Sequence, residues 1–416
     1  MTTLSYPKSG CCTCFVVILC ACGMDQRIAT PVGGSVAFSA ISSGGDVTCG
    51  RDGNGHAFCW GTGALGNGTT RDSARVPVPV AGGLVFRSLA VNGEFTCGVS
   101  DALATFCWGD GALGEHGQLG NDSAVGYSQP SVPVPGVTLS SVVVGQVHSC
   151  GLAAGGAAYC WGENLYGETG SGAVGGQFHT PVAVAGGISF VSLSSGSGWT
   201  NHTCGITATG AAYCWGMNNR GQLGIGRSGL VQCAAGGIYS GAPCGATPLP
   251  VTGGLAFGSI SVGGDHTCAV TFDHVGYCWG ENVHGALGTG SSGDTSYIPV
   301  PVSGGLKFLV ISAGLLHTCG LTTAHAAYCW GVNDYHALGT NTPGTSSAIP
   351  VPVETEVLFV AISSGFNHTC AITAAGAAYC WGAMLCGTTP DSYTCESDDF
   401  DGPAASLRRD AVHRGS

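Results

Sequence analysis

The chain has 416 residues and a net charge of −12, with only 12 lysines and arginines. A surface that binds the phosphate backbone of nucleic acid needs clustered cations, so nucleic acid is excluded as a partner. Its 73 glycines and 9% charged residues favour turns over helices. Its 23 cysteines are more than a cytosolic protein carries outside metal sites, and metal-type Cys-x2-Cys spacing is almost absent after the N-terminus. The composition therefore indicates disulfides and an oxidising compartment.

The N-terminus is consistent with export. Residues 14–21 form an apolar run that is too short to span a bilayer, and residues 1–21 are predicted to be a lipoprotein-like signal peptide. The string Leu19-Cys20-Ala21-Cys22 resembles a bacterial lipobox, which makes Cys22 the expected lipidation site. Simple signal cleavage and a misplaced start codon are the alternatives. Residues 22–29 would be a linker, and the lipid would be the only membrane attachment.

The rest of the chain is built from a repeat. The string Cys-Trp-Gly occurs seven times, with a second cysteine ten positions upstream of each copy and a period of 48 to 64 residues. A constant core with variable spacing places the insertions in loops. The tryptophans of the seven copies are Trp60, Trp108, Trp161, Trp215, Trp279, Trp330 and Trp381.

Each repeat predicts four short antiparallel strands. In the sixth copy these are 298–302, which carries prolines and belongs at a sheet edge, then 306–311, 317–322 and 326–330, separated by turns. Seven such units predict an all-β, seven-bladed β-propeller over residues 30–395. The last copy lacks a following Pro-Val strand, so residues 30–34 are expected to complete that blade. The tail, 396–416, is expected to be disordered.

The spacing of the cysteines predicts one disulfide per blade. In a hairpin centred between the two cysteines they lie opposite each other, about 4.5–5.5 Å apart at Cα, which is within disulfide range. Buried free thiols are the alternative. Two further pairs bracket the longest insertion and the C-terminal region. The predicted pairs are Cys49–Cys59, Cys97–Cys107, Cys150–Cys160, Cys204–Cys214, Cys268–Cys278, Cys319–Cys329, Cys370–Cys380, Cys233–Cys244 and Cys386–Cys395.

The unit resembles the regulator of chromosome condensation repeat. The resemblance rests on Trp215-Gly-Met-Asn-Asn-Arg-Gly-Gln-Leu-Gly224, on Gly117-Gln-Leu-Gly120 and on Gly314-Leu-Leu-His-Thr318, and it extends over about residues 31–388. It implies the propeller fold and is weakly specific for function. The family's namesake is a nuclear guanine-nucleotide exchange factor that binds chromatin. The export signal, the disulfides and the acidity of this chain depart from that role.

Two repeated side chains are interpreted as structural. A histidine stands two positions before the first cysteine in five copies, as His148, His202, His266, His317 and His368. A metal-binding ring is the alternative, but equivalent positions of radiating blades lie too far apart for one coordination sphere. We therefore expect the histidines to hydrogen-bond the glycine turn, and we expect the repeated tryptophans to pack between blades. No catalytic, cofactor or metal site is predicted.

Specificity is expected where the copies differ. Copy four has three extra residues around Trp199, which is predicted to be an exposed contact residue, with a packed loop as the alternative. Strand alternation places that loop on the same propeller face as the variable loops after Trp-Gly. Those loops carry further candidate contacts, although they could also vary for lack of constraint; the tyrosines are Tyr127, Tyr166, Tyr239, Tyr297 and Tyr335.

The sequence therefore predicts an exported or lipid-anchored scaffold at the bacterial cell envelope or outside the cell. We expect a monomer that binds an unknown protein, or a glycan, through one loop face. No hydrolase, P-loop or metalloprotease motif is present in the sequence. An extracellular enzyme or enzyme inhibitor that uses the face or the central channel is the second hypothesis, and guanine-nucleotide exchange is the third.

Overall fold

The computed structural model describes residues 29–69, 72–109, 116–122, 129–196, 198, 201–227, 231–233, 241–341, 345–383, 388–389 and 392–393. The predicted signal peptide, Cys22, the pair Cys386–Cys395 and the tail lie outside them. In the part of the chain that the structure describes, no helix has the length and apolarity needed to cross a membrane.

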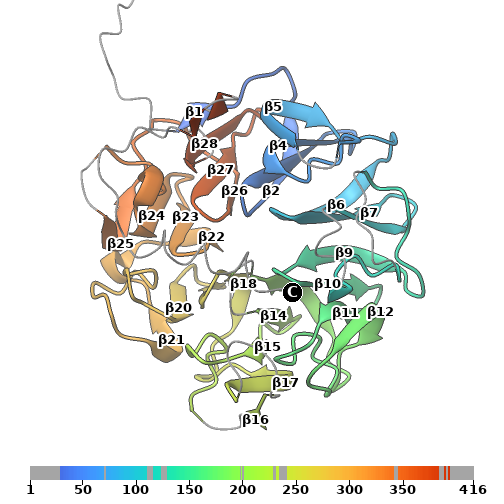
Figure 1. Cartoon of the computed structure of the whole chain (residues 1–416). Helices are drawn as coiled ribbons and strands as arrows, with labels where there is room; N and C mark the ends of the chain where they lie inside the picture. The colour runs from blue at the N-terminus through green and yellow to red at the C-terminus, as the bar shows by residue number, and fades with distance from the viewer. Residues whose placement is uncertain are drawn as a thin grey trace, which may run out of the picture.

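Seven antiparallel sheets surround a central axis, and each sheet is one blade of a propeller (Figure 1). Blade 1 contains β2 (Phe38–Gly44), β3 (Val47–Asp52), β4 (Ala57–Gly63) and β5 (Asp72–Pro79). Blade 2 contains β6 (Phe86–Asn92), β7 (Phe95–Ser100) and β8 (Thr105–Gly109). Blade 3 contains β9 (Leu139–Val144), β10 (His148–Ala153), β11 (Ala158–Glu163) and β12 (Gln177–Ala183). Blade 4 contains β13 (Phe190–Ser195), β14 (His202–Thr207), β15 (Ala212–Met217), β17 (Pro243–Pro250) and β16 (Val231–Gln232).

The remaining blades follow the same order. Blade 5 contains β18 (Phe257–Val262), β19 (His266–Thr271), β20 (Gly276–Gly280) and β21 (Ser296–Pro301). Blade 6 contains β22 (Phe308–Ala313), β23 (His317–Thr322), β24 (Ala327–Val332) and β25 (Ser346–Pro352). Blade 7 contains β26 (Ala361–Ser364), β27 (His368–Ile372), β28 (Ala378–Gly382) and β1 (Thr30–Pro31). Short 3-10 turns lie at Ser303–Gly305 and Asp334–His336, and β29 (Thr388–Thr389) pairs with β30 (Ser392–Tyr393).

The predicted seven-bladed propeller of four-stranded blades is confirmed, with two local differences. Among the described residues of blade 2, the outer strand is reduced to an isolated bridge between Phe106 and Pro133. Blade 4 gains a fifth strand, β16, from the longest insertion. The predicted closure is also confirmed: Thr30 pairs with Cys380, and Pro31 with Tyr379. The innermost strands β2 and β26 contact each other, which closes the ring between the first and last blades.

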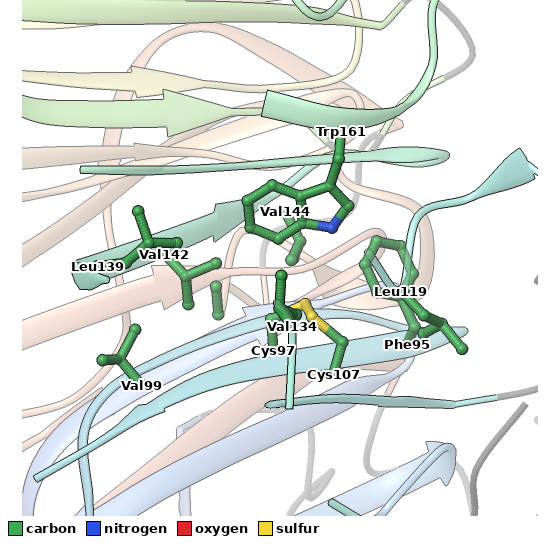
Figure 2. Close-up of a cluster of buried hydrophobic side chains, with 11 residues drawn as sticks. Phe95, Cys97, Val99, Cys107, Leu119, Val134, Leu139, Val142, Val144 and Trp161 are labelled. Atoms are coloured by element: carbon green, nitrogen blue, oxygen red, sulfur yellow. A yellow bond between two sulfur atoms is a disulfide. The ribbon is translucent and has the colours of Figure 1, made fainter. Parts of the chain in front are cut away.

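The predicted blade disulfides occupy the interior. In all seven blades the two cysteines lie directly opposite each other, with Cα atoms 4.0 to 4.1 Å apart. Cys233 and Cys244 are also bonded, which ties β16 to β17. Figure 2 shows how Cys97–Cys107 of blade 2 packs with Val99 against Leu139, Val142 and Trp161 of blade 3. The disulfides therefore belong to the cores between neighbouring blades.

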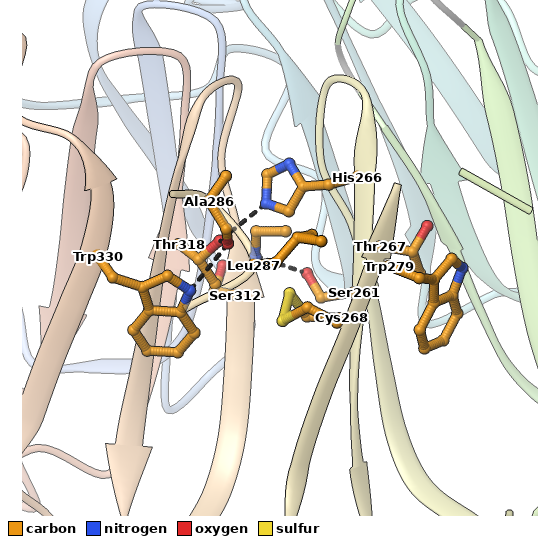
Figure 3. The surroundings of a disulfide bond; sticks show 12 residues. Ser261, His266, Thr267, Cys268, Trp279, Ala286, Leu287, Ser312, Thr318 and Trp330 are labelled. Atoms are coloured by element: carbon orange, nitrogen blue, oxygen red, sulfur yellow. Dashed lines mark hydrogen bonds between the residues drawn. A yellow bond between two sulfur atoms is a disulfide. The ribbon is translucent and has the colours of Figure 1, made fainter. Parts of the chain in front are cut away.

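Buried histidines join neighbouring blades at five seams. In each case the Nε2 atom lies 2.7 to 2.9 Å from a threonine Oγ1 of the next blade; the pairs are His148–Thr203, His202–Thr267, His266–Thr318, His317–Thr369 and His368–Thr48. The Thr318 hydroxyl donates to the Ala286 carbonyl (Figure 3), so it accepts from the Nε2–H of His266. We call these contacts the interblade His–Thr bonds.

The structural role expected of the histidines is confirmed, and their Nε2 partner is a threonine of the next blade. The His317 side chain also hydrogen-bonds the backbone of Phe366 in the glycine turn of the next blade, whereas the turn of its own blade is held by backbone, as where the Gly145 N–H donates to the His148 carbonyl. The histidine side chain crosses to the next blade because its neighbours in three dimensions are not its neighbours in sequence. Burial lowers the pKa of His148, His266 and His368 to about 3 and that of His317 to about 4, so these rings are neutral at ordinary pH.

Candidate functional site

One face of the propeller is formed by the turn after the first strand and the loop after the third strand of each blade. We call it the Trp-Gly face. In blade 5 the Glu281 N–H donates to the Asp265 carbonyl at 2.9 Å, which holds loop and turn side by side. Five other blades have the same bond; the pairs are Thr62–Asp46, Glu163–Val147, Met217–Asn201, Val332–Leu316 and Ala383–Asn367. The predicted location of both loop sets on one face is therefore confirmed for these blades.

The structure separates the predicted contact residues. Trp199, Tyr127 and Tyr239 lie outside the described residues. Tyr335 is 52% exposed in the loop of blade 6, at a backbone φ of 56°. Tyr297 is half-buried, and the Arg227 guanidinium lies 3.9 Å from the centre of its ring.

The interpretation of Tyr166 as a surface contact was wrong. Its side chain is only 5% exposed and packs with Met217 and the Cys233–Cys244 disulfide. The insertion of blade 4 covers this ring. The sequence does not indicate which loops of one blade are covered by the next blade. Among the described tyrosines, Tyr335 is therefore the contact candidate that remains exposed.

An exposed apolar and acidic surface lies where blades 5 and 6 meet on the Trp-Gly face. Asp265, Glu281, Val283, His284 and Leu315 line one small hollow, and Val283 is 51% exposed. His284 acts electrostatically on Asp334, the residue next to Tyr335, which places the loops of the two blades together. We call Asp265, Glu281, Val283, His284, Leu315 and Tyr335 the blade 5–6 sector.

The carboxyl groups of Asp265 and Glu281 share a hydrogen bond in this sector. Burial, and after it the negative charge of Asp265, together raise the pKa of Glu281 to about 6, while Arg220 opposes the shift from 3.4 Å away. A bound cation would be favoured here, because it would relieve the repulsion between the two carboxylates. Carboxyls within hydrogen-bond distance are closer than the roughly 5–9 Å separation used in glycoside hydrolysis.

Sequence reasoning missed this carboxyl pair, although a signal was present. In six blades the residue after Trp-Gly is bonded to the residue before the histidine position, so these two positions are neighbours there. Copy five has acidic residues at both positions, Asp265 and Glu281. Copy two also does, with Glu94 and Asp110, but Asp110 lies outside the described residues.

A buried carboxyl elsewhere has a structural explanation. Burial raises the pKa of Glu168 to about 8, so it is protonated at neutral pH. Its Oε2 accepts from the Tyr166 N–H at 2.8 Å, just as Gln222 in the next blade accepts from the Arg220 N–H at 2.8 Å. A protonated carboxyl thus occupies the place of a glutamine amide in the loop, and we assign Glu168 no role at the surface.

Two family models of the Regulator of chromosome condensation (RCC1) repeat match the chain. One matches residues 209–270, 276–321 and 325–372, and the other matches 139–168, 190–222, 310–337 and 359–388, so together they cover more than half of the chain.

Curated relatives and solved structures agree with these matches. The ultraviolet-B receptor UVR8 of Arabidopsis thaliana is 30% identical over 280 residues, 64% of this chain and 59% of the receptor. The mitochondrial RCC1 domain-containing protein RUG3 of the same plant is 31% identical over 282 residues, 63% of this chain and 60% of that protein. The alignments thus span about three fifths of each relative. Yeast RCC1 (Prp20), in a structure with Kap60, has the same fold at a TM-score of 0.65 and 21% identity, covering 90% of this chain and 89% of that chain.

Proposed function

The chain belongs to the regulator of chromosome condensation repeat family, and from that premise we propose that it is an exported scaffold that binds a protein partner through the blade 5–6 sector of the Trp-Gly face. The observation that carries the proposal is the exposure of Val283 beside the Asp265–Glu281 carboxyl pair, with Tyr335 exposed on the adjoining loop of blade 6. Exposed aromatic anchors next to polar groups are typical of interaction hot spots.

The interior supports a scaffold role. The repeated tryptophans are at most 1% exposed, and the repeated histidines are bonded between blades. These groups are therefore used for architecture and are not available to bind a ligand. Variation between copies falls in the loops of the Trp-Gly face, where a partner would find features that a single blade possesses. We propose no catalytic activity for this surface.

The chemistry of the sector defines the partner. Glu281 and Asp265 would favour a lysine or arginine side chain, and Tyr335, Val283 and Leu315 would pack against an apolar residue beside it. We therefore propose a protein segment in which a cation adjoins an apolar side chain. A glycan would stack on Tyr335 without needing the carboxyl pair, and the two are distinguished by replacing Glu281.

Export is the second part of the proposal. Eight disulfides join described cysteines, and such a number is typical of proteins from oxidising compartments. We propose the bacterial cell envelope or the extracellular space, with Cys22 as the lipid anchor. Fractionation of the natural host with and without inhibition of lipoprotein processing tests this. Cytosolic protein with free thiols would contradict export.

The binding proposal is tested by affinity capture with matched variants. Tyr335→Asn removes the ring and keeps a residue type that tolerates positive φ, and Glu281→Gln removes the charge. Ile349→Ala is the control, because Ile349 is 50% exposed on β25 at the outer edge of the same blade. We expect both sector variants to lose a protein that the wild type and the control retain. Equal capture by all four proteins would contradict the proposal.

A further inference from the structure

A cavity of about 180 Å³ lies between blades 1 and 2, far in sequence from the blade 5–6 sector. It is lined from β2 by Ile41 and Ser42, from β3 by Arg51, and from β6 by Arg87, Ser88 and Leu89. Two of the chain's few cations therefore line the same cavity. This convergence needs a physical reason in a chain with a net charge of −12.

Arg51 departs from the pattern of its own repeat. It stands two residues after the first cysteine of blade 1. In the other six blades this position holds an aliphatic residue that is at most 5% exposed; these residues are Val99, Leu152, Ile206, Val270, Leu321 and Ile372. The Arg51 Nη1 atom donates to the Phe86 carbonyl of blade 2 at 2.8 Å, so the guanidinium reaches across the seam. A charged side chain at a position that is apolar and buried in the other blades lowers the stability of the fold unless hydrogen bonds or an opposite charge compensate it.

Arg87 supplies the second charge from the innermost strand of blade 2. The equivalent residues of the other blades are uncharged; they are Ser39, Ser140, Val191, Gly258, Leu309 and Val360. Within the described residues neither guanidinium forms an ion pair, and no carboxyl lines the cavity. Asp52, the acidic residue next to Arg51, instead accepts from the Asn54 and His56 N–H groups of its turn. Within the described residues the two guanidinium groups therefore have no carboxylate partner; Arg51 is half-buried, and Arg87 is exposed at the mouth of the cavity.

The seam that holds the cavity is also one of the two that lack an interblade His–Thr bond, because blades 1 and 2 have Val47 and Phe95 in place of the histidine. Val47 replaces the histidine of blade 1, and the Oγ1 of Thr96, its would-be partner in blade 2, is buried without a hydrogen-bond partner. Blades 1 and 2 are therefore joined without a His–Thr bond, by apolar contacts, by Arg51 and by the hydrogen bond from the Val91 N–H to the Ser42 hydroxyl. A ligand that bridged Arg51 and Arg87 would add a polar link between the two blades.

We propose that this cavity binds an oxyanion, a carboxylate or a phosphate group, between the guanidinium groups of Arg51 and Arg87. Guanidinium groups bind such anions through paired N–H donors. The Ser42 hydroxyl already accepts the Val91 N–H group of blade 2, so its own hydrogen can donate to the anion. The Ser88 hydroxyl accepts the Val142 N–H group of blade 3 and therefore faces the other seam. The volume suits a group of a few heavy atoms with some water, at about 30 Å³ per water molecule.

The test is titration of the whole protein with inorganic phosphate and, separately, with acetate, at constant ionic strength set with chloride. Isothermal calorimetry and the melting temperature are the two readouts. If phosphate alone binds saturably, the site is assigned to phosphate groups. If acetate alone binds saturably, the site is assigned to carboxylates, and either result supports the proposal. Failure of both anions to bind would overturn it, whatever the partner of the Trp-Gly face.

The variants come from the sister blades. Arg51→Leu installs the residue of blade 6, and Arg87→Ser installs the residue of blades 1 and 3. We expect each variant to weaken anion binding at least tenfold, because each loses a pair of charge-assisted hydrogen bonds to the anion. Arg75→Ser, which removes an exposed arginine on β5 outside the cavity, should bind as the wild type does.

The stability of Arg51→Leu without anion gives an independent readout. If Arg51 serves a ligand, leucine should raise the melting temperature of the anion-free protein and abolish its increase with added anion. A lower melting temperature together with wild-type anion binding would overturn the proposal, because Arg51 would then be a structural tether to Phe86.

Discussion

Acid should unfold this propeller through its buried histidines. The unfolded chain binds a proton at each histidine below about pH 6.5. The folded chain cannot do so until the pH falls to about 3 for His148, His266 and His368, or about 4 for His317. These histidines therefore contribute stability that is complete above about pH 6.5 and is lost as the pH falls toward 4 and 3.

The size of the effect follows from the number of groups. Each histidine changes the free energy of unfolding by about 1.4 kcal/mol per pH unit inside this window. Glu168 acts in the opposite direction, because its pKa is about 8 in the folded chain and lower in the unfolded chain. Its contribution to the free energy of unfolding is complete below about pH 4.5 and is lost as the pH rises toward 8. Four histidines less Glu168 leave about 4 kcal/mol per pH unit above pH 6, and Glu281, whose pKa is raised to about 6, reduces this to about 3 kcal/mol per pH unit between about pH 6 and 4.5. Since domains are stable by about 5–15 kcal/mol, we expect unfolding between about pH 6 and 4.

Urea unfolding at several pH values, followed by the fluorescence of the buried tryptophans, measures this slope. His317→Asn removes one titrating group and should reduce the slope by about 1.4 kcal/mol per pH unit. Thr369→Val removes the hydrogen-bond partner of His317 and the bond to Ser364 but no titrating group, so it should lower stability by about 1–2 kcal/mol at every pH and leave the slope unchanged. An unfolding free energy that stays constant from pH 7 to 5 would refute the reasoning.

Three further predictions concern the blades. Replacing both Cys319 and Cys329 by alanine should cost about 3 kcal/mol in urea unfolding, since the loop between them is short; unchanged stability would contradict a bonded pair. Gly224→Ala should lower the melting temperature, because φ is 68° and a Cβ would lie 2.6 Å from the tryptophan Nε1 of the next blade; a wild-type value would contradict that packing. Val47→His should pair the orphaned Thr96 and stabilise the protein by about 1 kcal/mol, and a loss of stability would show that the seam cannot accept the ring.

Much of the fold could be predicted from the sequence because the repeat supplies its own alignment. The positions of Cys319 and Cys329 define a hairpin, and hairpin geometry places the two residues opposite each other. The spare strand at Thr30 could be assigned to blade 7 because the last copy lacked its outer strand. The partner of His148 could not be predicted in the same way, because Thr203 belongs to another blade and depends on how blades stack.

The candidate site was less predictable. Tyr335 and Tyr166 follow Trp-Gly in equivalent loops, yet one is exposed and the other is covered by an insertion of the next blade. Only the packing between blades distinguishes them. The Asp265–Glu281 pair and the departure of Arg51 from its repeat position could both be recognised by comparing copies column by column. What the copies share describes the architecture, whereas single departures from it mark the candidate sites.

Site-specific photo-crosslinking tests the central claim most directly. A photoreactive amino acid is placed at Tyr335 in the blade 5–6 sector and, in a second protein, at Ile349 on the outer edge of the same blade. We predict that the protein labelled at position 335 crosslinks to one protein of the cell envelope or medium of the natural host, and that excess unlabelled wild type prevents this. Identical products from both positions, or products from position 349 alone, would contradict the claim that this sector is the binding surface.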